Sequence, residues 1–240
     1  MQLHSIRIIL VGTTHPGNIG STARAMKTMG LQQLYLVSPK TFPNQQAYDL
    51  SAGAYDILDQ AIVVDNLKDA LNNCKLVFAM SARPRHLSLP GFTPAECATF
   101  LTTLDDDTEV AFLFGREHAG LTNDELLHSH YHVQIPSNHL FSSLNLAQSV
   151  QVMAYEIRTK LLSAPAIVTM QQEELASSID IERFYTHLFQ VLKVIGFLKK
   201  NPGRVEHRLR RLFNRVKLEL TEVKMLRGML TRVERLLPPE

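Results

Sequence analysis

Six short apolar runs recur along the first 135 residues of the chain. Most of them are apolar at nearly every position, which is the pattern of strands buried on both faces. Because segments with helical periodicity lie between the runs, we expect an α/β fold, a parallel sheet with helices on both faces. The runs are Ile6–Val11, Leu34–Val37, Ala61–Val64, Leu76–Met80, Val110–Phe114 and Tyr131–Ile135.

The segments between these runs predict helices of about 8 to 14 residues. Thr122 and Glu125 have the spacing of a capping box, which marks the start of one of them. A longer helix, from Ser143 to about Leu162, ends the α/β part of the chain. The shorter helices are expected at Asn18–Met29, Gln45–Ala52, Leu67–Asn73, Pro94–Leu104 and Thr122–Ser129.

The last quarter of the chain has only helical periodicity. A helix is expected from about Ile181 to Lys200, where the sequence Asn-Pro-Gly stops it. Apolar residues then recur at spacings of three and four, which places one apolar stripe on each further helix. We therefore expect an α/β domain over residues 1–162, a linker over 163–178 and a small all-α domain over 179–240.

Positive charge is concentrated in this helical tail. Residues 193–235 hold thirteen Lys or Arg and four acids, a surplus of nine positive charges, whereas the whole chain carries +2 and its remainder therefore −7. This asymmetry favours an anionic polymer as partner, with nucleic acid ahead of a membrane surface. A solvated helix face would give the same count.

Composition and spacing argue against several other classes of protein. The longest apolar runs fall far short of the roughly 20 residues of a membrane span, and the N-terminus lacks the features of a secretory signal. Cys74 and Cys97 are too few for a disulfide framework or a closed zinc site. His128, His130 and His132 alternate as ligands on a strand would, but they straddle an expected helix end, so we predict no metal. We expect a cytoplasmic protein with no membrane partner.

Three loops that contain Gly or Asn follow three different strands. They are Gly12–Gly20, Phe114–Leu121 and Ile135–Ala147. The first is not a phosphate-binding P-loop, because Asn18 and Ile19 replace its Lys and Ser or Thr, and no Gly-x-Gly-x-x-Gly follows that strand. Ligands of open α/β sheets bind beyond the carboxyl ends of the strands, so the three loops are candidates for one shared site. Turn and capping chemistry explains any one of them alone.

The motifs in these loops resemble those of a known family. They occur in order, each after a strand, and are similar to the three motifs of the SPOUT RNA methyltransferases, nearest to the TrmH-like branch that methylates ribose 2′-oxygens. The resemblance covers about residues 5–160. The motif residues are Asn18, Gly20 and Arg24, then Phe114, Gly115, Glu117, Gly120 and Leu121, then Ile135, Pro136, Ser143, Leu144 and Asn145.

The resemblance implies both a fold feature and a methyl donor. The α/β domain would end in a C-terminal trefoil knot, in which the chain after the last strand threads through an earlier loop. The donor would be S-adenosyl-L-methionine, bound by backbone groups of three loops. Carried onto this chain, the donor-binding positions are Met80, Ser81, Ala82, Gly115, Ile135, Ser142, Ser143 and Leu144.

The same resemblance implies catalytic roles for the polar motif residues. Arg24 would either remove the proton of the ribose hydroxyl or grip a phosphate, since an Arg of pKa above about 12 is a poor base unless strongly perturbed. Asn18, together with Asn145 or Ser143, would order the site. Glu117 would orient Arg24 or its loop.

The protein expected from this resemblance is a homodimeric tRNA ribose 2′-O-methyltransferase that acts on cytidine or uridine at nucleotide 32 of the anticodon loop. The helix after the first motif and the long helix after Ser143 are the expected dimer contacts, and the basic tail is expected to bind tRNA. Two alternatives stay open. One is a non-catalytic RNA-binding or assembly factor with the same fold, and the other is a ribosomal-RNA 2′-O-methyltransferase.

Overall fold

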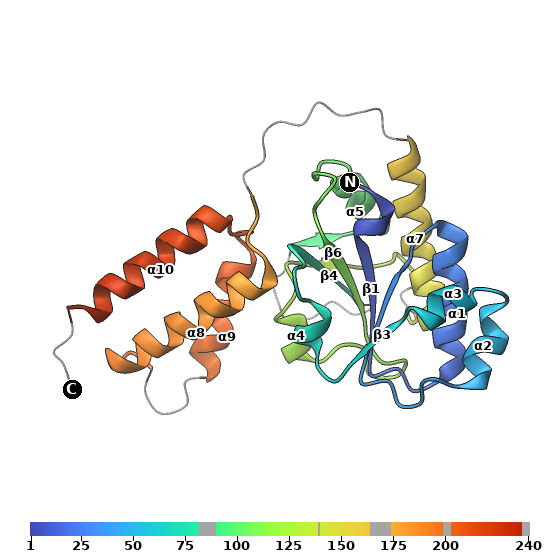
Figure 1. Ribbon diagram of the computed structural model, residues 1–240, viewed down its shortest axis with the longest axis horizontal. Helices are drawn as coiled ribbons and strands as arrows, with labels where there is room; N and C mark the ends of the chain where they lie inside the picture. The colour runs from blue at the N-terminus through green and yellow to red at the C-terminus, as the bar shows by residue number, and fades with distance from the viewer. Residues whose placement is uncertain (82–89, 139, 164–173, 199–202, 237–240) are drawn as a thin grey trace.

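The protein is built around a seven-stranded sheet in which all strand pairs are parallel (Figure 1). It is seen here in a computed structural model that describes residues 1–81, 90–138, 140–163, 174–198 and 203–236. The strand order is β3-β2-β1-β6-β4-β7-β5. The strands are β1 (Ile6–Val11), β2 (Gln33–Val37), β3 (Ile62–Val64), β4 (Leu76–Met80), β5 (Gly91–Phe92), β6 (Val110–Phe114) and β7 (Tyr131–Val133).

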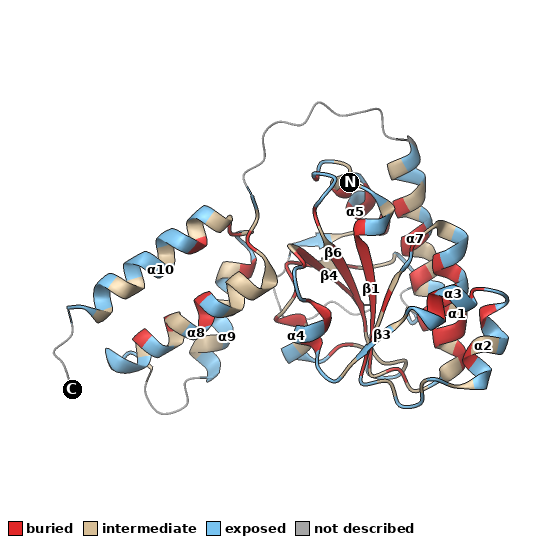
Figure 2. Ribbon diagram, in the orientation of Figure 1, coloured by how far each residue is buried: buried red, intermediate tan, exposed pale blue. Residues whose placement is uncertain are grey.

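Helices cover both faces of the sheet, as the apolar strands predict. Alternate side chains of β1 enter two separate cores, Ile8 and Leu10 on one side and Ile9 and Val11 on the other. The central strands are therefore buried throughout, which Figure 2 shows as unbroken red. The first core contains α1 (Pro16–Met29), α2 (Gln45–Ser51), α3 (Tyr55–Asp59), α5 (Pro94–Leu101) and α7 (Leu146–Ser163), and the second contains α4 (Leu67–Ala70) and α6 (Asn123–Leu126).

The two edge strands β3 and β5, and also β7, differ from the sequence prediction. The edge strand β3 exposes nearly half of the side chains of Ile62 and Val63, so this strand is not covered on both faces. The short strand β5 was not predicted, because two residues carry no periodicity. β7 ends at Val133 rather than at Ile135.

Several helices start or end at residues other than those that their apolar stripes predict. The predicted helix from Ser143 begins only at Leu146, because the Asn145 side chain accepts a hydrogen bond from the Ala147 N–H (2.9 Å). The predicted helix to Asn73 ends at Ala70, and Asn73 itself has a positive φ. The predicted helices to Leu104 and Ser129 end at Leu101 and Leu126, and the short helix α3 was missed. The capping box of Thr122 and Glu125 is confirmed.

Three further helices form a separate cluster at the C-terminal end of the chain. They are α8 (Ser178–Val194), α9 (Gly203–Asn214) and α10 (Leu220–Glu234) (Figure 1). The first begins three residues earlier than predicted, because Ser177 caps it, and it ends six residues earlier, at Val194. Phe184, Tyr185 and Val223 are buried in the core of this cluster. None of the helices that the structure describes is long and apolar enough to cross a bilayer.

The C-terminal helices dock on the α/β part through polar contacts. Ser178 donates its N–H to the Cys74 carbonyl (3.0 Å) and its hydroxyl to the Leu71 carbonyl (2.5 Å). The Lys217 ammonium lies 4.3 Å from the ring centre of Phe100 and 5.1 Å from that of Tyr131. Burial lowers the pKa of Lys217.

Candidate functional site

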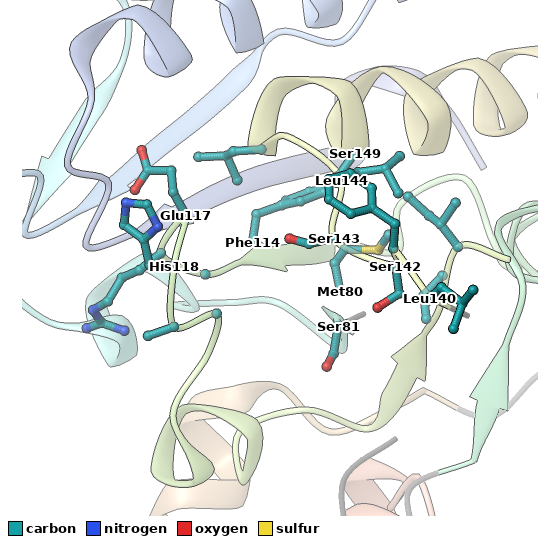
Figure 3. Close-up of a pocket in the computed structure, with 18 residues that line it drawn as sticks. Met80, Ser81, Phe114, Glu117, His118, Leu140, Ser142, Ser143, Leu144 and Ser149 are labelled. Atoms are coloured by element: carbon teal, nitrogen blue, oxygen red, sulfur yellow. The ribbon is translucent and has the colours of Figure 1, made fainter. Parts of the chain in front are cut away.

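A pocket of about 330 Å³ lies beyond the carboxyl ends of β4, β6 and β7 (Figure 3). Its size is at the lower end of the range of small-molecule sites. The terminal strand residues Met80, Phe114 and Val133 line it, together with residues of the loops that follow β4, β6 and β7. These loop residues are Ser81, Gly115, Arg116, Glu117, His118, Ala119, Gly120, Ile135, Leu140, Phe141, Ser142, Ser143 and Leu144.

The residues predicted to bind a methyl donor are close together in this pocket. Those that line it are Met80, Ser81, Gly115, Ile135, Ser142, Ser143 and Leu144, which are all of the predicted set that the structure describes. Ala82 lies outside the described residues. Figure 3 shows Met80 and Ser81, at the end of β4, next to Ser142 and Ser143, which come from a loop far away in sequence.

Gly115 allows the loop after β6 to fold back tightly on itself. The Arg116 N–H donates to the Gly120 carbonyl (3.2 Å), and the Gly120 N–H donates to the Arg116 carbonyl (2.8 Å). A Cβ atom at Gly115 would overlap the backbone of Gly120 and Leu121. A larger residue at position 115 would therefore force the two sides of the loop apart.

Glu117 joins this loop to the loop after β1. One carboxylate oxygen accepts hydrogen bonds from the N–H (3.1 Å) and the hydroxyl (2.8 Å) of Thr14. The other accepts from the N–H of His15 (3.1 Å) and the side-chain amide of Asn18 (2.9 Å). Of the two predicted roles for Glu117, the structure shows contacts with the loop of Arg24, and none with Arg24 itself among the described residues.

These hydrogen bonds fix the charge of Glu117. Burial alone would raise the pKa of the carboxyl group, but the hydrogen bonds from Asn18, Thr14 and its own backbone overcome this and lower the pKa to about 2. Glu117 is therefore ionised throughout the neutral range, as an acceptor of four hydrogen bonds requires.

Asn18 and Asn145 connect the first motif to the third. The Asn145 side-chain amide donates to the side-chain oxygen of Asn18 (2.9 Å), and the side-chain amide of Asn18 donates to Glu117. The side-chain carbonyl of Asn145 caps α7. One hydrogen-bonded chain thus runs from α7 through Asn18 to the loop after β6, and Ser143 lies in the adjacent pocket wall.

Comparison with known proteins gives the family of this chain. The SpoU rRNA Methylase family matches residues 5–155, and the family described as tRNA methyltransferase TrmJ, C-terminal domain, matches residues 179–240. The chain belongs to the SpoU methylase family. This confirms the SPOUT relationship that the three motifs predicted.

Individual members of the SpoU methylase family are similar over the whole chain. The tRNA (cytidine/uridine-2′-O-)-methyltransferase TrmJ of Sodalis glossinidius is 54% identical over 100% of this chain and 95% of its own. The protein of the same name from Yersinia enterocolitica is 50% identical over 98% of this chain and 93% of its own. The crystal structure of TrmJ from Z. mobilis ZM4 superposes with a TM-score of 0.85 at 32% identity, covering 95% of this chain and 98% of that one.

Arg24 stands apart from the other motif residues. It is exposed on α1, and its side chain has no hydrogen bond or ion pair within the described part of the chain. It is also not one of the described residues that line the pocket. The structure therefore brings Asn18, Glu117 and Asn145 together but leaves Arg24 facing outward.

Sequence reasoning missed Arg116, which lies between two residues of the second motif. Its guanidinium donates two hydrogen bonds of 3.0 Å to Glu125. A Cβ atom at Gly12, which has a φ of +60°, would lie 2.7 Å from the Arg116 Nε. Thr14 was missed as well, because a threonine in a turn gives no signal of a carboxylate partner in a distant loop.

The three alternating histidines have separate structural roles. The Val77 N–H donates to His130 Nδ1 (3.1 Å), and His132 Nε2 lies 3.3 Å from the Ser81 carbonyl oxygen. His128 lies 3.8 Å from Glu182 of α8. Across the described ranges, His, Cys, Asp and Glu nowhere form a group of three or more that could hold a metal ion.

Proposed function

We infer that this protein transfers the methyl group of S-adenosyl-L-methionine to a ribose 2′-oxygen of tRNA. Relatives that are 50% and 54% identical over nearly the whole chain are named for this activity on cytidine and uridine. The observation that carries the inference is that the second and third motif loops line one pocket, and that hydrogen bonds from Glu117 and Asn145 join Asn18 of the first motif to them. We propose nucleotide 32 of the anticodon loop as the target, on the strength of the motif resemblance.

The pocket fits a donor of this kind. Gly115 and Gly120 of the doubled-back loop line the pocket, and Met80, Ile135 and Leu144 provide apolar surface next to the polar Ser142. Bound there, S-adenosyl-L-methionine would supply a methyl group on a cationic sulfur. Because such a group needs little activation, the protein has mainly to position the ribose, which can lower a barrier by up to about 7 to 11 kcal/mol.

The polar residues beside the pocket have distinct tasks. Asn18 and Asn145 hold each other and fix the entrance of α1, where the substrate ribose would lie. Glu117 is not the proton acceptor, since both of its oxygens are occupied and its pKa is about 2. Arg24 would bind the phosphate next to the ribose, because a guanidinium stays charged and matches phosphate geometry.

Replacing Gly115 by Ala is expected to weaken binding of S-adenosyl-L-methionine by at least about tenfold, because the added methyl separates the two sides of the loop after β6. Isothermal titration calorimetry with the donor measures this. Gly228→Ala in α10 is the control, since nothing lies within 4 Å of a Cβ there and its backbone is helical. Unchanged donor affinity in the Gly115 variant would remove this loop from the proposed donor site.

We propose that the enzyme is a homodimer in which Arg24 of one subunit acts at the pocket of the other. Arg24 faces outward on α1, away from the residues that line the pocket of its own chain. The neighbouring helix α7 exposes two large apolar side chains, Tyr155 and Leu162. Contacts through α1 and α7 would cover this apolar surface and bring Arg24 to a second pocket.

The proposed domain organisation has three parts. Residues 1–162 form the methyltransferase domain, residues 163–178 a linker of which 164–173 lie outside the described residues, and residues 179–240 the helical extension. We further propose that the methyltransferase domain ends in a trefoil knot. One support is the match to the SpoU methylase family. Another is that β7 lies between β4 and β5 in the sheet, and that residues 140–144 of the segment after β7 line the pocket. A tRNA-modifying enzyme of this kind would work in the cytoplasm.

The helical extension offers one face for the tRNA backbone. Arg204, Arg208 and Arg211 are spaced by four and three residues, so they form a stripe along α9, and Arg215 follows directly after the end of this helix. None of the four has an ion pair within the described part of the protein. Arg210 differs, because it pairs with Glu182 at 2.5 and 3.0 Å and stacks on Tyr185. We assign tRNA phosphate binding to the stripe and a structural role to Arg210.

The double variant Arg208→Glu/Arg211→Glu is expected to weaken tRNA binding and to reduce the slope of log Kd against log salt by about one for each phosphate that the protein no longer binds. Filter binding at several salt concentrations measures both. Lys224→Glu/Arg232→Glu on α10 changes the net charge equally and serves as the control. Equal reductions in the two variants would mean that net charge, and not the α9 stripe, determines tRNA affinity.

Mass-spectrometric mapping of ribose methyl groups in RNA from a deletion strain tests the proposed function. The expected result is loss of one 2′-O-methyl group from tRNA, at cytidine or uridine 32. Loss from ribosomal RNA instead would favour the alternative that the family description raises. No change in any ribose methyl group would favour a non-catalytic RNA-binding factor.

A further inference from the structure

The one-turn helix α6 is held at its two ends by different parts of the protein. At its N-terminal end, Thr122 and Glu125 form the capping box. Glu125 also accepts two hydrogen bonds of 3.0 Å from Arg116, which lines the pocket. The start of α6 is thus joined directly to the pocket wall formed by residues 115–120.

The C-terminal end of α6 is held by the C-terminal helices. The buried Asn214, at the end of α9, donates its side-chain amide to the carbonyl of Leu127, the residue after α6. The Asn214 side-chain oxygen accepts a hydrogen bond of 2.6 Å from the Tyr185 hydroxyl of α8. The second bond fixes the orientation of the amide, so its N–H₂ group points at Leu127.

The short helix depends on these contacts. A single helical turn is not stable by itself, since one turn costs more conformational entropy than its hydrogen bonds return. Leu126 and Leu127 are buried, so the Leu127 carbonyl needs a donor inside the protein. Asn214 provides that donor from a region that the methyltransferase family match does not include, since this match ends at residue 155.

We propose that Asn214 is a positioning residue for the methyl-donor pocket. Through Leu127 and α6 it keeps Glu125 in place against Arg116, and Arg116 in turn fixes the loop of residues 115–120. The helical extension therefore shapes the donor site in addition to binding tRNA. This proposal rests on the proposed function, because it takes S-adenosyl-L-methionine as the ligand of the pocket.

The test compares two variants of Asn214 with a matched control. Asn214→Asp keeps the oxygen that accepts from Tyr185 but loses the donor to Leu127, and Asn214→Leu loses that donor without adding charge. Ser178→Ala also removes one side-chain hydrogen bond from the C-terminal helices to a backbone carbonyl, that of Leu71, which is far from α6 in sequence. All three are made in the full-length protein and measured below their melting temperatures.

Both Asn214 variants are expected to raise the calorimetric Kd for S-adenosyl-L-methionine about tenfold in the absence of tRNA, and to raise its KM with little change in kcat. Their affinity for tRNA without donor is expected to equal that of the unmodified protein, because Asn214 is buried. Ser178→Ala should leave the donor Kd unchanged. Equal donor Kd values for the unmodified protein and both Asn214 variants, or an equal rise in the control, would overturn the proposal.

Hydrogen–deuterium exchange separates failure of this proposal from failure of the proposed function. Without any ligand, amides of residues 115–127 are expected to exchange faster in both Asn214 variants than in Ser178→Ala. Absence of donor binding by the unmodified protein would contradict the proposed function, and the exchange result would still decide the link from Asn214 to the pocket loop. Unchanged exchange over residues 115–127 in both Asn214 variants would exclude that link.

Discussion

Arg24→Ala is expected to lower kcat/KM for tRNA methylation by about a hundredfold to a thousandfold, the reduction typical of removing one preorganised charged or polar contact at a reaction centre. The side chain is exposed on α1 and has no partner in the described part of the chain, so its removal should leave the fold and the donor affinity intact. Steady-state kinetics and donor calorimetry measure the two effects. Lys27→Ala, which removes another exposed cation of the same helix, should keep nearly full activity.

Mixed dimers reveal which subunit supplies Arg24. Co-expression of Arg24→Ala chains with Gly115→Ala chains creates heterodimers. In each heterodimer the Arg24→Ala subunit has an intact pocket, and the Gly115→Ala subunit still has Arg24. If the site spans two subunits, a random mixture should recover about a quarter of normal activity. The assay uses a donor concentration at which the Gly115→Ala parent has little activity. If Arg24 instead serves the pocket of its own chain, the mixture should be no more active than its parents, and the proposed dimeric site would be wrong.

Glu117→Gln is expected to lower kcat/KM by about a hundredfold, because an amide cannot accept all four hydrogen bonds that now join two loops. At least one of the donors Thr14 N–H, His15 N–H or Asn18 would face the new NH₂ group. Glu96→Gln is the matched control, since Glu96 likewise accepts from the N–H and hydroxyl of a threonine, at the start of α5. A Glu117 variant as active as the Glu96 variant would show that the loop connection is dispensable.

The low pKa of Glu117 predicts that the free energy of unfolding depends on pH. The pKa of Glu117 lies at about 2, below the ordinary value of 4.5, so its ionised form stabilises the fold at all pH values above 4.5. This contribution is lost as the pH falls from 4.5 towards 2. Urea unfolding should therefore show a difference between the unmodified protein and Glu117→Gln that is constant above pH 4.5 and shrinks below it.

The central strands were predictable because burial on both faces leaves an uninterrupted apolar run. Leu76–Met80 and Val110–Phe114 match β4 and β6 to the residue. The edge of the sheet was not predictable in this way. Ile62 and Val63 have the same composition as a buried strand but are half exposed, since the order of strands is set by tertiary packing that a local pattern does not contain.

The candidate site was predictable as a set of positions and not as a set of contacts. The motifs named Asn18, Glu117 and Asn145, which the structure joins by hydrogen bonds. The order and spacing of the motifs could not reveal that Thr14 and His15 both donate to the Glu117 carboxylate, because this contact joins loops about a hundred residues apart. Nor could they reveal that Arg24 is exposed. Asn214 carried no signal, since a lone asparagine at a helix end is ordinary in sequence.

The central claim is that the motif loops after β1, β6 and β7 form one site that brings a methyl donor to a tRNA ribose. Incubation of the purified protein with unmodified tRNA and isotopically labelled S-adenosyl-L-methionine, followed by mass spectrometry of the digested nucleosides, tests this most directly. The account predicts label in 2′-O-methylcytidine or 2′-O-methyluridine, formed at least about a hundredfold more slowly by the Arg24→Ala variant. Label on a base, or no labelled nucleoside at all, would contradict it.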